Sequence, residues 1–100
     1  MEKSTPHCKL SVIKDLIAAG NVLATGTATK GAAALGMDAN AMLSVVQSLT
    51  TRDFYKSMTT YNDHTVWQDV YRPKTAMGVL YVKLTVEDGV LIVSFKRSTS

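Results

Sequence analysis

Cysteine, proline and long apolar runs are all scarce in this sequence. Cys8 is the single cysteine, so no internal disulfide can form. The longest apolar runs span only a few residues, which is too short for a membrane-spanning helix. The N-terminal stretch MEKSTPHCKL lacks the apolar segment of a secretory signal. We therefore expect a soluble cytoplasmic protein that does not enter a membrane.

The length and composition predict one ordinary globular domain. A chain of 100 residues fits one domain and is too short for two, so we expect residues 1–100 to form a single unit. Hydrophobic residues make up 46% and charged residues 19%, a balance that argues against disorder. The net charge is +3, and residues 51–100 carry seven basic side chains against five acidic ones. This mild excess is compatible with a polyanionic substrate, although most such charges form a solvated surface.

The first half of the chain reads as three helices. Apolar residues recur at helical spacing over 11–19, and Gly20 is placed to cap that helix. A short helix is predicted over 29–35, although a glycine inside it lowers its helix propensity. A third helix follows Asp38, whose side chain can accept from the first free backbone amides. Its apolar stripe consists of Met42, Val45, Val46 and Leu49.

The second half of the chain reads as strands, because β-branched and aromatic residues alternate there with polar ones. We expect four strands, at about 54–60, 66–72, 78–86 and 90–96. Helices followed by an antiparallel meander give an α+β fold. The prediction is therefore three N-terminal helices packed on one face of an antiparallel sheet of about four strands.

The last two strands are predicted to form a hairpin whose turn is Asp88-Gly89, a strong hairpin signal. A two-residue turn makes the numbers of facing residues sum to 177. The apolar pairs on the core face would then be Val86 with Leu91, Leu84 with Val93, and Val82 with Phe95. The other face would pair Lys83 with Ser94 and Tyr81 with Lys96.

Few residues outside this hairpin suggest chemistry. His7 and Cys8 are adjacent, which is not the spacing of a zinc site, so we expect no metal. Asp63-His64 is a possible acid–base pair, but such loop residues are more often turn formers. Tyr81 opposite Lys96 could transfer a proton or bind a phosphate, because a lysine stabilises a phenolate and orients the hydroxyl. Spacing alone favours the alternative, an exposed cross-strand pair that adds little stability.

Two neighbouring segments carry a family signature: DFYKSMTTY at 53–61 and DHTVWQDVYRP at 63–73. With MEK at 1–3, TPH at 5–7 and LIVSFK at 91–96, they closely resemble the motility quorum-sensing regulator (MqsR) toxin family. The resemblance implies a RelE-like microbial RNase fold. The active-site residues that it implies are Lys56, Gln68, Tyr81 and Lys96. The same motifs contain the residues that we expect to bind substrate: Tyr55, Met58 and Arg72.

The resemblance also implies the activity and the partners. Family members are endoribonuclease toxins of type II toxin–antitoxin systems that cleave messenger RNA, at GC-containing sites, and halt translation and growth. The 2′-hydroxyl of RNA is the nucleophile, so no metal or cofactor is needed, and the products carry a 2′,3′-cyclic phosphate and a 5′-hydroxyl. The expected partners are single-stranded messenger RNA and a zinc-binding helix-turn-helix antitoxin, with the toxin alone monomeric.

Two other functions remain open from the sequence. The same basic sheet face would serve a non-catalytic nucleic-acid-binding regulator, and a degenerate toxin would keep only its antitoxin-binding surface. A binder has no need of Lys56, Gln68, Tyr81 and Lys96 together. The intact set therefore favours catalysis.

Overall fold

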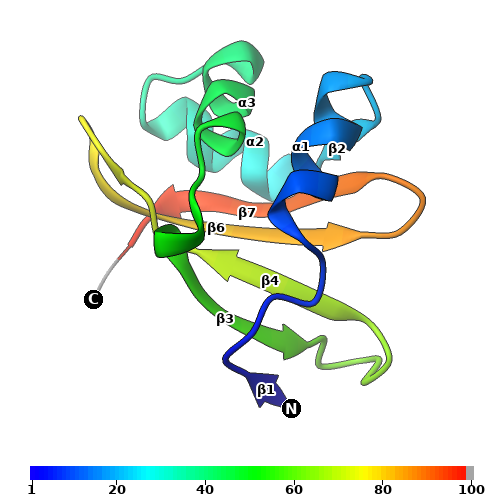
Figure 1. Cartoon of the computed structure of the whole chain (residues 1–100). Helices are drawn as coiled ribbons and strands as arrows, with labels where there is room; N and C mark the ends of the chain where they lie inside the picture. The colour runs from blue at the N-terminus through cyan, green and yellow to red at the C-terminus, as the bar shows by residue number, and fades with distance from the viewer. Residues whose placement is uncertain (99–100) are drawn as a thin grey trace.

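The computed structural model describes residues 1–98, in which three helices lie together on one side of a sheet (Figure 1). The helices are α1 (Leu10–Ala18), α2 (Gly26–Ala34) and α3 (Ala39–Gln47), with a 3₁₀ turn at Thr51–Asp53. The strands are β1 (Glu2–Lys3), β2 (Val22–Ala24), β3 (Phe54–Thr59), β4 (Trp67–Tyr71), β5 (Lys74–Thr75), β6 (Gly78–Val86) and β7 (Val90–Arg97). Among these described helices, none has the length and apolar character to cross a membrane.

Side-chain caps fix where α2 and α3 begin. The Asp38 carboxylate accepts the backbone N–H of Ala41 at 2.8 Å, which confirms the predicted cap of the third helix. The second helix was predicted to begin at residue 29, but it begins at Gly26 because the Thr25 hydroxyl caps it. Gly31 lies where α2 crosses β7, and a Cβ there would collide with the carbonyl oxygen of Phe95. The glycine that weakened the helix prediction is therefore required by close packing.

The sheet corrects the predicted architecture. The expected arrangement of three helices on an antiparallel sheet of about four strands is wrong, because the sheet formed by residues 1–98 has seven strands and is mixed. The strand order is β1-β3-β4-β6-β7-β2, with β5 paired to β6, and β2 runs parallel to β7. The unpredicted strands β1, β2 and β5 have only two or three residues each, too few for alternation to develop. The fold remains α+β overall.

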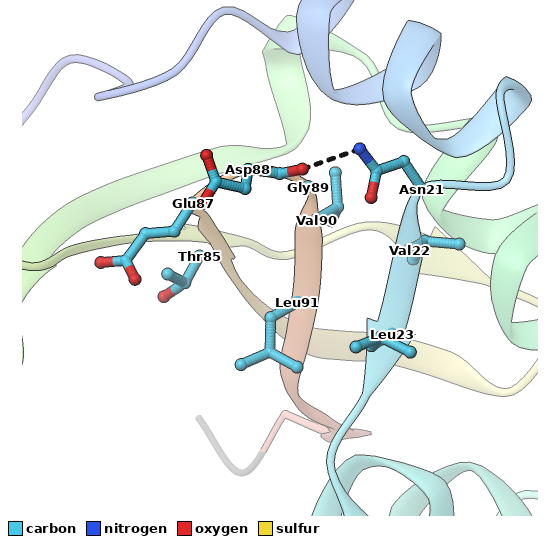
Figure 2. Close-up of a pocket in the computed structure, with 9 residues that line it drawn as sticks. All are labelled: Asn21, Val22, Leu23, Thr85, Glu87, Asp88, Gly89, Val90 and Leu91. Carbon is cyan, nitrogen blue, oxygen red and sulfur yellow. Dashed lines mark hydrogen bonds between the residues drawn. The ribbon is translucent and has the colours of Figure 1, made fainter.

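The predicted two-residue turn of the last hairpin is also wrong. Val86 pairs with Val90, so three residues form the connection, and Asp88 has a positive φ of 59°. The Asn21 side chain donates to the Asp88 carbonyl oxygen at 2.7 Å and holds this turn against the start of β2 (Figure 2). A bulge in β7 then absorbs the extra residue, because Leu84 pairs with Ile92 while Lys83 pairs with Ser94.

The bulge decides which side chains of the hairpin enter the core. Val90, Ile92 and Phe95 are buried in β7, whereas Leu91 and Val93, predicted for the core, are only partly buried. Beyond the bulge the predicted register holds, and Tyr81 pairs with Lys96. The core lies between the helices and one sheet face, formed by Ile13, Ile17, Ala28, Ala32, Met42, Val46, Leu49, Tyr71, Leu80, Val82, Leu84, Val90, Ile92 and Phe95. The strand residues that alternate with these core residues point to the opposite sheet face, which the helices do not cover.

A buried carboxylate fastens the N-terminal segment across the helix-side face. Asp69 is 3% exposed and accepts the backbone N–H groups of His7 at 2.9 Å and Cys8 at 3.0 Å. It also accepts a hydrogen bond from the buried hydroxyl of Ser57 on β3. These bonds hold the segment that connects β1, which pairs with β3 at the sheet edge, to α1.

Candidate active site

The sheet face that is turned away from the helices carries a row of basic residues. Lys56 of β3 pairs with Val70 of β4, which pairs with Lys83 of β6. Because directly paired residues point to the same face, both lysines stand on this face with Val70 buried between them. The next row contains the pair Tyr81 and Lys96. The register therefore places three lysines and a tyrosine together.

Five of the seven predicted site residues line one hollow of about 320 Å³, which we call the lysine–tyrosine hollow. Its lining residues are Tyr55, Lys56, Arg72, Tyr81, Lys96, Arg97 and Ser98. The ammonium of Lys96 lies 5.5 Å from the centre of the Tyr81 ring. The Lys56 ammonium and the Arg72 guanidinium lie 5.3 and 5.2 Å from the centre of the Tyr55 ring. The hollow therefore combines cations with two aromatic rings, which suits a phosphate and its attached base.

The other two predicted residues, Gln68 and Met58, lie beside this hollow rather than in it. They are a cross-strand pair and line a neighbouring hollow of about 380 Å³, called here the Gln68 hollow, together with His64 and Lys83. Lys83 stands between the two hollows, because its ammonium is also 5.7 Å from the centre of the Tyr81 ring. The two hollows are therefore neighbours on the same sheet face.

His64 is on the exposed loop between β3 and β4, at the rim of the Gln68 hollow. Its neighbour Asp63 accepts from both the backbone N–H and the hydroxyl of Thr65, at 2.9 and 2.6 Å. These bonds hold the pKa of Asp63 below its usual value. Asp63 therefore acts as a turn former, the more common role of such a residue.

The charged groups of the site shift one another's proton affinities. Burial raises the pKa of Tyr81, against the lowering effect of Lys56, so the phenol keeps its proton at neutral pH. A hydrogen bond to Glu2 raises the pKa of Lys56, which keeps this ammonium charged. Burial, and then the charges of Lys96 and Lys56, lower the pKa of Lys83. The site therefore offers positive charge and a protonated phenol to an anionic ligand.

The residues that sequence reasoning missed include Lys83 and Glu2 on this face, and Arg97 and Ser98 in the lining of the lysine–tyrosine hollow. Lys83 had a usable signal, because the hairpin register already placed it on the same face as Tyr81 and Lys96. Glu2 had no local signal, because it reaches the face only through the two-residue strand β1. Its carboxylate oxygen Oε2 lies 2.7 Å from the Lys56 ammonium.

One further hollow, of about 340 Å³, lies between β2 and the hairpin turn (Figure 2). Valine, leucine and glycine account for much of its lining, and none of the predicted site residues reaches it. This hollow, at the turn end of the hairpin, is therefore separate from the predicted site residues.

Comparison with known proteins shows which family the chain belongs to. Residues 5–97 match the family described as motility quorum-sensing regulator, toxin of MqsA. The chain belongs to this family. It is also 55% identical over 97 residues to the mRNA interferase toxin MqsR of Escherichia coli strain K12. That alignment covers 97% of this chain and 99% of the relative, so the family likeness extends over both halves of the fold.

Proposed function

We propose that this protein is an endoribonuclease toxin that cleaves single-stranded messenger RNA without a metal ion. The observation that carries the proposal is the gathering of Lys56, Tyr81 and Lys96 around one hollow on the helix-free sheet face. Family membership and the similarity to the mRNA interferase toxin MqsR of Escherichia coli support the same activity. A chain that cuts messenger RNA acts in the cytoplasm, where that substrate is translated.

The reaction needs little from the protein beyond charge and proton transfer, because RNA supplies its own nucleophile. The 2′-hydroxyl attacks the adjacent phosphorus, the bond from phosphorus to the 5′ oxygen breaks, and a 2′,3′-cyclic phosphate and a 5′-hydroxyl result. Lys56 and Lys96 neutralise the charge that grows on the phosphate oxygens. Tyr81, which keeps its proton at neutral pH, donates to the departing 5′ oxygen.

Substrate binding uses the residues around these groups. Tyr55 is 49% exposed, so a base of a single strand can stack on its ring. Arg72 stands beside that ring and pairs with a phosphate. Gln68 and Met58 contact the neighbouring nucleotide, with the Gln68 amide hydrogen-bonded to a base edge. The partner that restrains the toxin is an antitoxin protein, for which the family implies a zinc-binding helix-turn-helix type.

Cleavage of a labelled RNA in excess EDTA tests the proposal. We expect the wild-type chain to cut the RNA and Lys96→Ala to cut it about 10²–10⁴-fold more slowly, as for loss of a group that stabilises charge or moves a proton. The matched control is Lys9→Ala, which removes an exposed lysine at the start of α1 and should leave the rate unchanged. RNA that is bound but stays intact would instead establish a non-catalytic nucleic-acid-binding regulator.

A further inference from the structure

The proposed reaction lacks a group that accepts the proton of the 2′-hydroxyl. Such a group has to be unprotonated at neutral pH. Lys56 and Tyr81 do not meet this condition, because the pKa of each is raised above its ordinary value. Gln68 does not titrate. None of these three residues is therefore suited to be the base, which leaves that role open to a residue outside the set predicted from the sequence.

Strand β1 brings the carboxylate of Glu2 to the sheet face that carries the predicted site residues. Glu2 pairs with Met58 of β3, so its side chain points to the same sheet face as Met58 and Lys56. Lys3 points the opposite way, and its ammonium lies 4.1 Å from the centre of the Trp67 ring on the other face. The alternation of β1 therefore directs Glu2 toward the site.

The position of Glu2 is fixed from both sides. The backbone N–H of Thr59 donates to the Met1 carbonyl oxygen at 2.9 Å, and the Lys56 ammonium donates to Glu2 Oε2 at 2.7 Å. In the part of the chain that the structure describes, the second carboxylate oxygen, Oε1, has no hydrogen-bond partner. Glu2, Tyr55 and Lys56 share a further open hollow of about 400 Å³, and Tyr55 and Lys56 also line the lysine–tyrosine hollow. Among the described residues that line these two hollows, Glu2 is the only carboxylate.

We propose that Glu2 is the general base of the cleavage reaction, an assignment that rests on the proposed function. The carboxylate takes the proton of the 2′-hydroxyl as the 2′ oxygen forms its bond to phosphorus. The bond from phosphorus to the 5′ oxygen breaks in the same step, and Tyr81 protonates the departing oxygen. One proton enters the protein and one leaves it, so the step balances without a metal or a further reactant.

The charges that face Glu2 set the pH range in which this base works. Lys56 on β3 lowers the pKa of Glu2 through its hydrogen bond and its charge, and the Met1 amino group acts in the same direction. Tyr81 on β6 also feels the Glu2 charge, but it is neutral until high pH. The carboxylate is therefore ionised at neutral pH, and its activity is lost as the pH falls through its pKa.

A competing role for Glu2 is that of a clamp that holds Lys56 until RNA displaces it. The two roles predict opposite results for Glu2→Gln, which keeps the side-chain size and a hydrogen-bond acceptor but is not a base. Loss of a clamp frees Lys56 for phosphate, so cleavage should become faster. Loss of a base should slow the single-turnover rate by about 10²–10⁴-fold.

The test measures single-turnover cleavage of a labelled RNA by Glu2→Gln, with Glu87→Gln as the control. Glu87 is an exposed glutamate in the hairpin turn, so its variant makes the same charge change away from the site. We expect Glu2→Gln to cleave slowly and Glu87→Gln to cleave at the wild-type rate. Both variants should bind the 2′-O-methyl form of the same RNA as tightly as the wild type. A wild-type or faster rate for Glu2→Gln overturns the assignment. If Lys96→Ala is inactive in that case, the chain is still the proposed endoribonuclease, and only the assignment of Glu2 as its base is refuted.

The pH profile of the rate gives a second readout that does not depend on the Glu2 variant. In the wild type the rate should fall at low pH, as Glu2 takes up a proton. In Lys56→Met this acidic limb should move to higher pH, because the cation that lowers the pKa of Glu2 is gone. If the cleavage rate of Lys56→Met falls over the same acidic pH range as that of the wild type, Glu2 is not the general base.

Discussion

Asp69 is the residue whose loss should separate the N-terminal segment from the sheet. Its carboxylate accepts the backbone N–H groups of His7 and Cys8 and the hydroxyl of Ser57. In Asp69→Asn one of the two oxygens becomes an NH₂ group, which then faces an N–H donor. The substitution keeps the volume, so the effect comes from hydrogen bonding rather than from a cavity.

The magnitude follows from the number and environment of these bonds. A hydrogen bond to a charged group contributes about 1.5–3 kcal/mol, and a buried donor left without a partner costs about 1–3 kcal/mol. The buried hydroxyl of Ser57 cannot reach water, whereas the amides of His7 and Cys8 can when the segment lifts. We therefore expect a loss of about 2–4 kcal/mol in the free energy of unfolding.

Urea unfolding with linear extrapolation measures this loss, and hydrogen exchange locates it. The amides of His7 and Cys8 should exchange faster in Asp69→Asn, while those of β6 and β7 should change only with global stability. Asp15→Asn is the control, since Asp15 is exposed on α1 and its variant should stay within about 0.5 kcal/mol of wild type. A loss below 1 kcal/mol, or unchanged exchange at His7 and Cys8, would refute the reasoning.

Three further predictions concern the helix–sheet contact and the site. Gly31→Ala should destabilise the fold by about 1–3 kcal/mol, because its Cβ would collide with the Phe95 carbonyl oxygen; an unchanged melting temperature would contradict this. Tyr81→Phe and Lys96→Ala should each slow cleavage, and the double variant should lose clearly less than the sum in free energy, whereas strictly additive losses would show that they do not act on one phosphate. Lys83→Met should weaken RNA binding and reduce the slope of log affinity against log salt concentration by about 0.7. An unchanged slope would show that Lys83 does not contact a phosphate of the RNA.

The helices and the four long strands could be predicted because each has a local signal. Asp38 caps α3 as its sequence position suggests, and the alternation in β6 continues over nine residues. The two-residue strand β1 has no such signal, since its pairing with β3 joins residues that are more than fifty positions apart. The placement of Glu2 beside Lys56 was therefore outside the reach of local reasoning.

The hairpin shows how a correct pairing can come from an incorrect turn. Residues 90–93 are all apolar, so alternation does not reveal which of them face the core. The turn is set by Asn21, a residue far away in the sequence, whose side chain binds the Asp88 carbonyl oxygen. The extra turn residue and the bulge in β7 offset each other, which is why Tyr81 still faces Lys96.

The resemblance grouped Gln68 with Lys56, Tyr81 and Lys96, whereas the structure distributes these residues over two adjacent hollows. The motif conveys which residue types occur together, but it does not convey which strand position each occupies. Gln68 pairs with Met58, which is two residues from Lys56 on β3. Gln68 therefore lines the neighbouring hollow instead of the one that Lys56 lines. The sequence pattern therefore indicates which residues lie near one another better than it indicates which hollow each of them lines.

Analysis of the RNA ends produced in EDTA tests the central claim most directly. The chain should cut a single-stranded RNA without divalent metal, and mass spectrometry should find a 2′,3′-cyclic phosphate or its 3′-phosphate on one fragment and a 5′-hydroxyl on the other. The same RNA with a 2′-deoxy nucleotide on the 5′ side of the cut should stay intact at that position. Fragments with a 5′-phosphate and a 3′-hydroxyl, or cleavage of the deoxy-substituted site, would contradict the account.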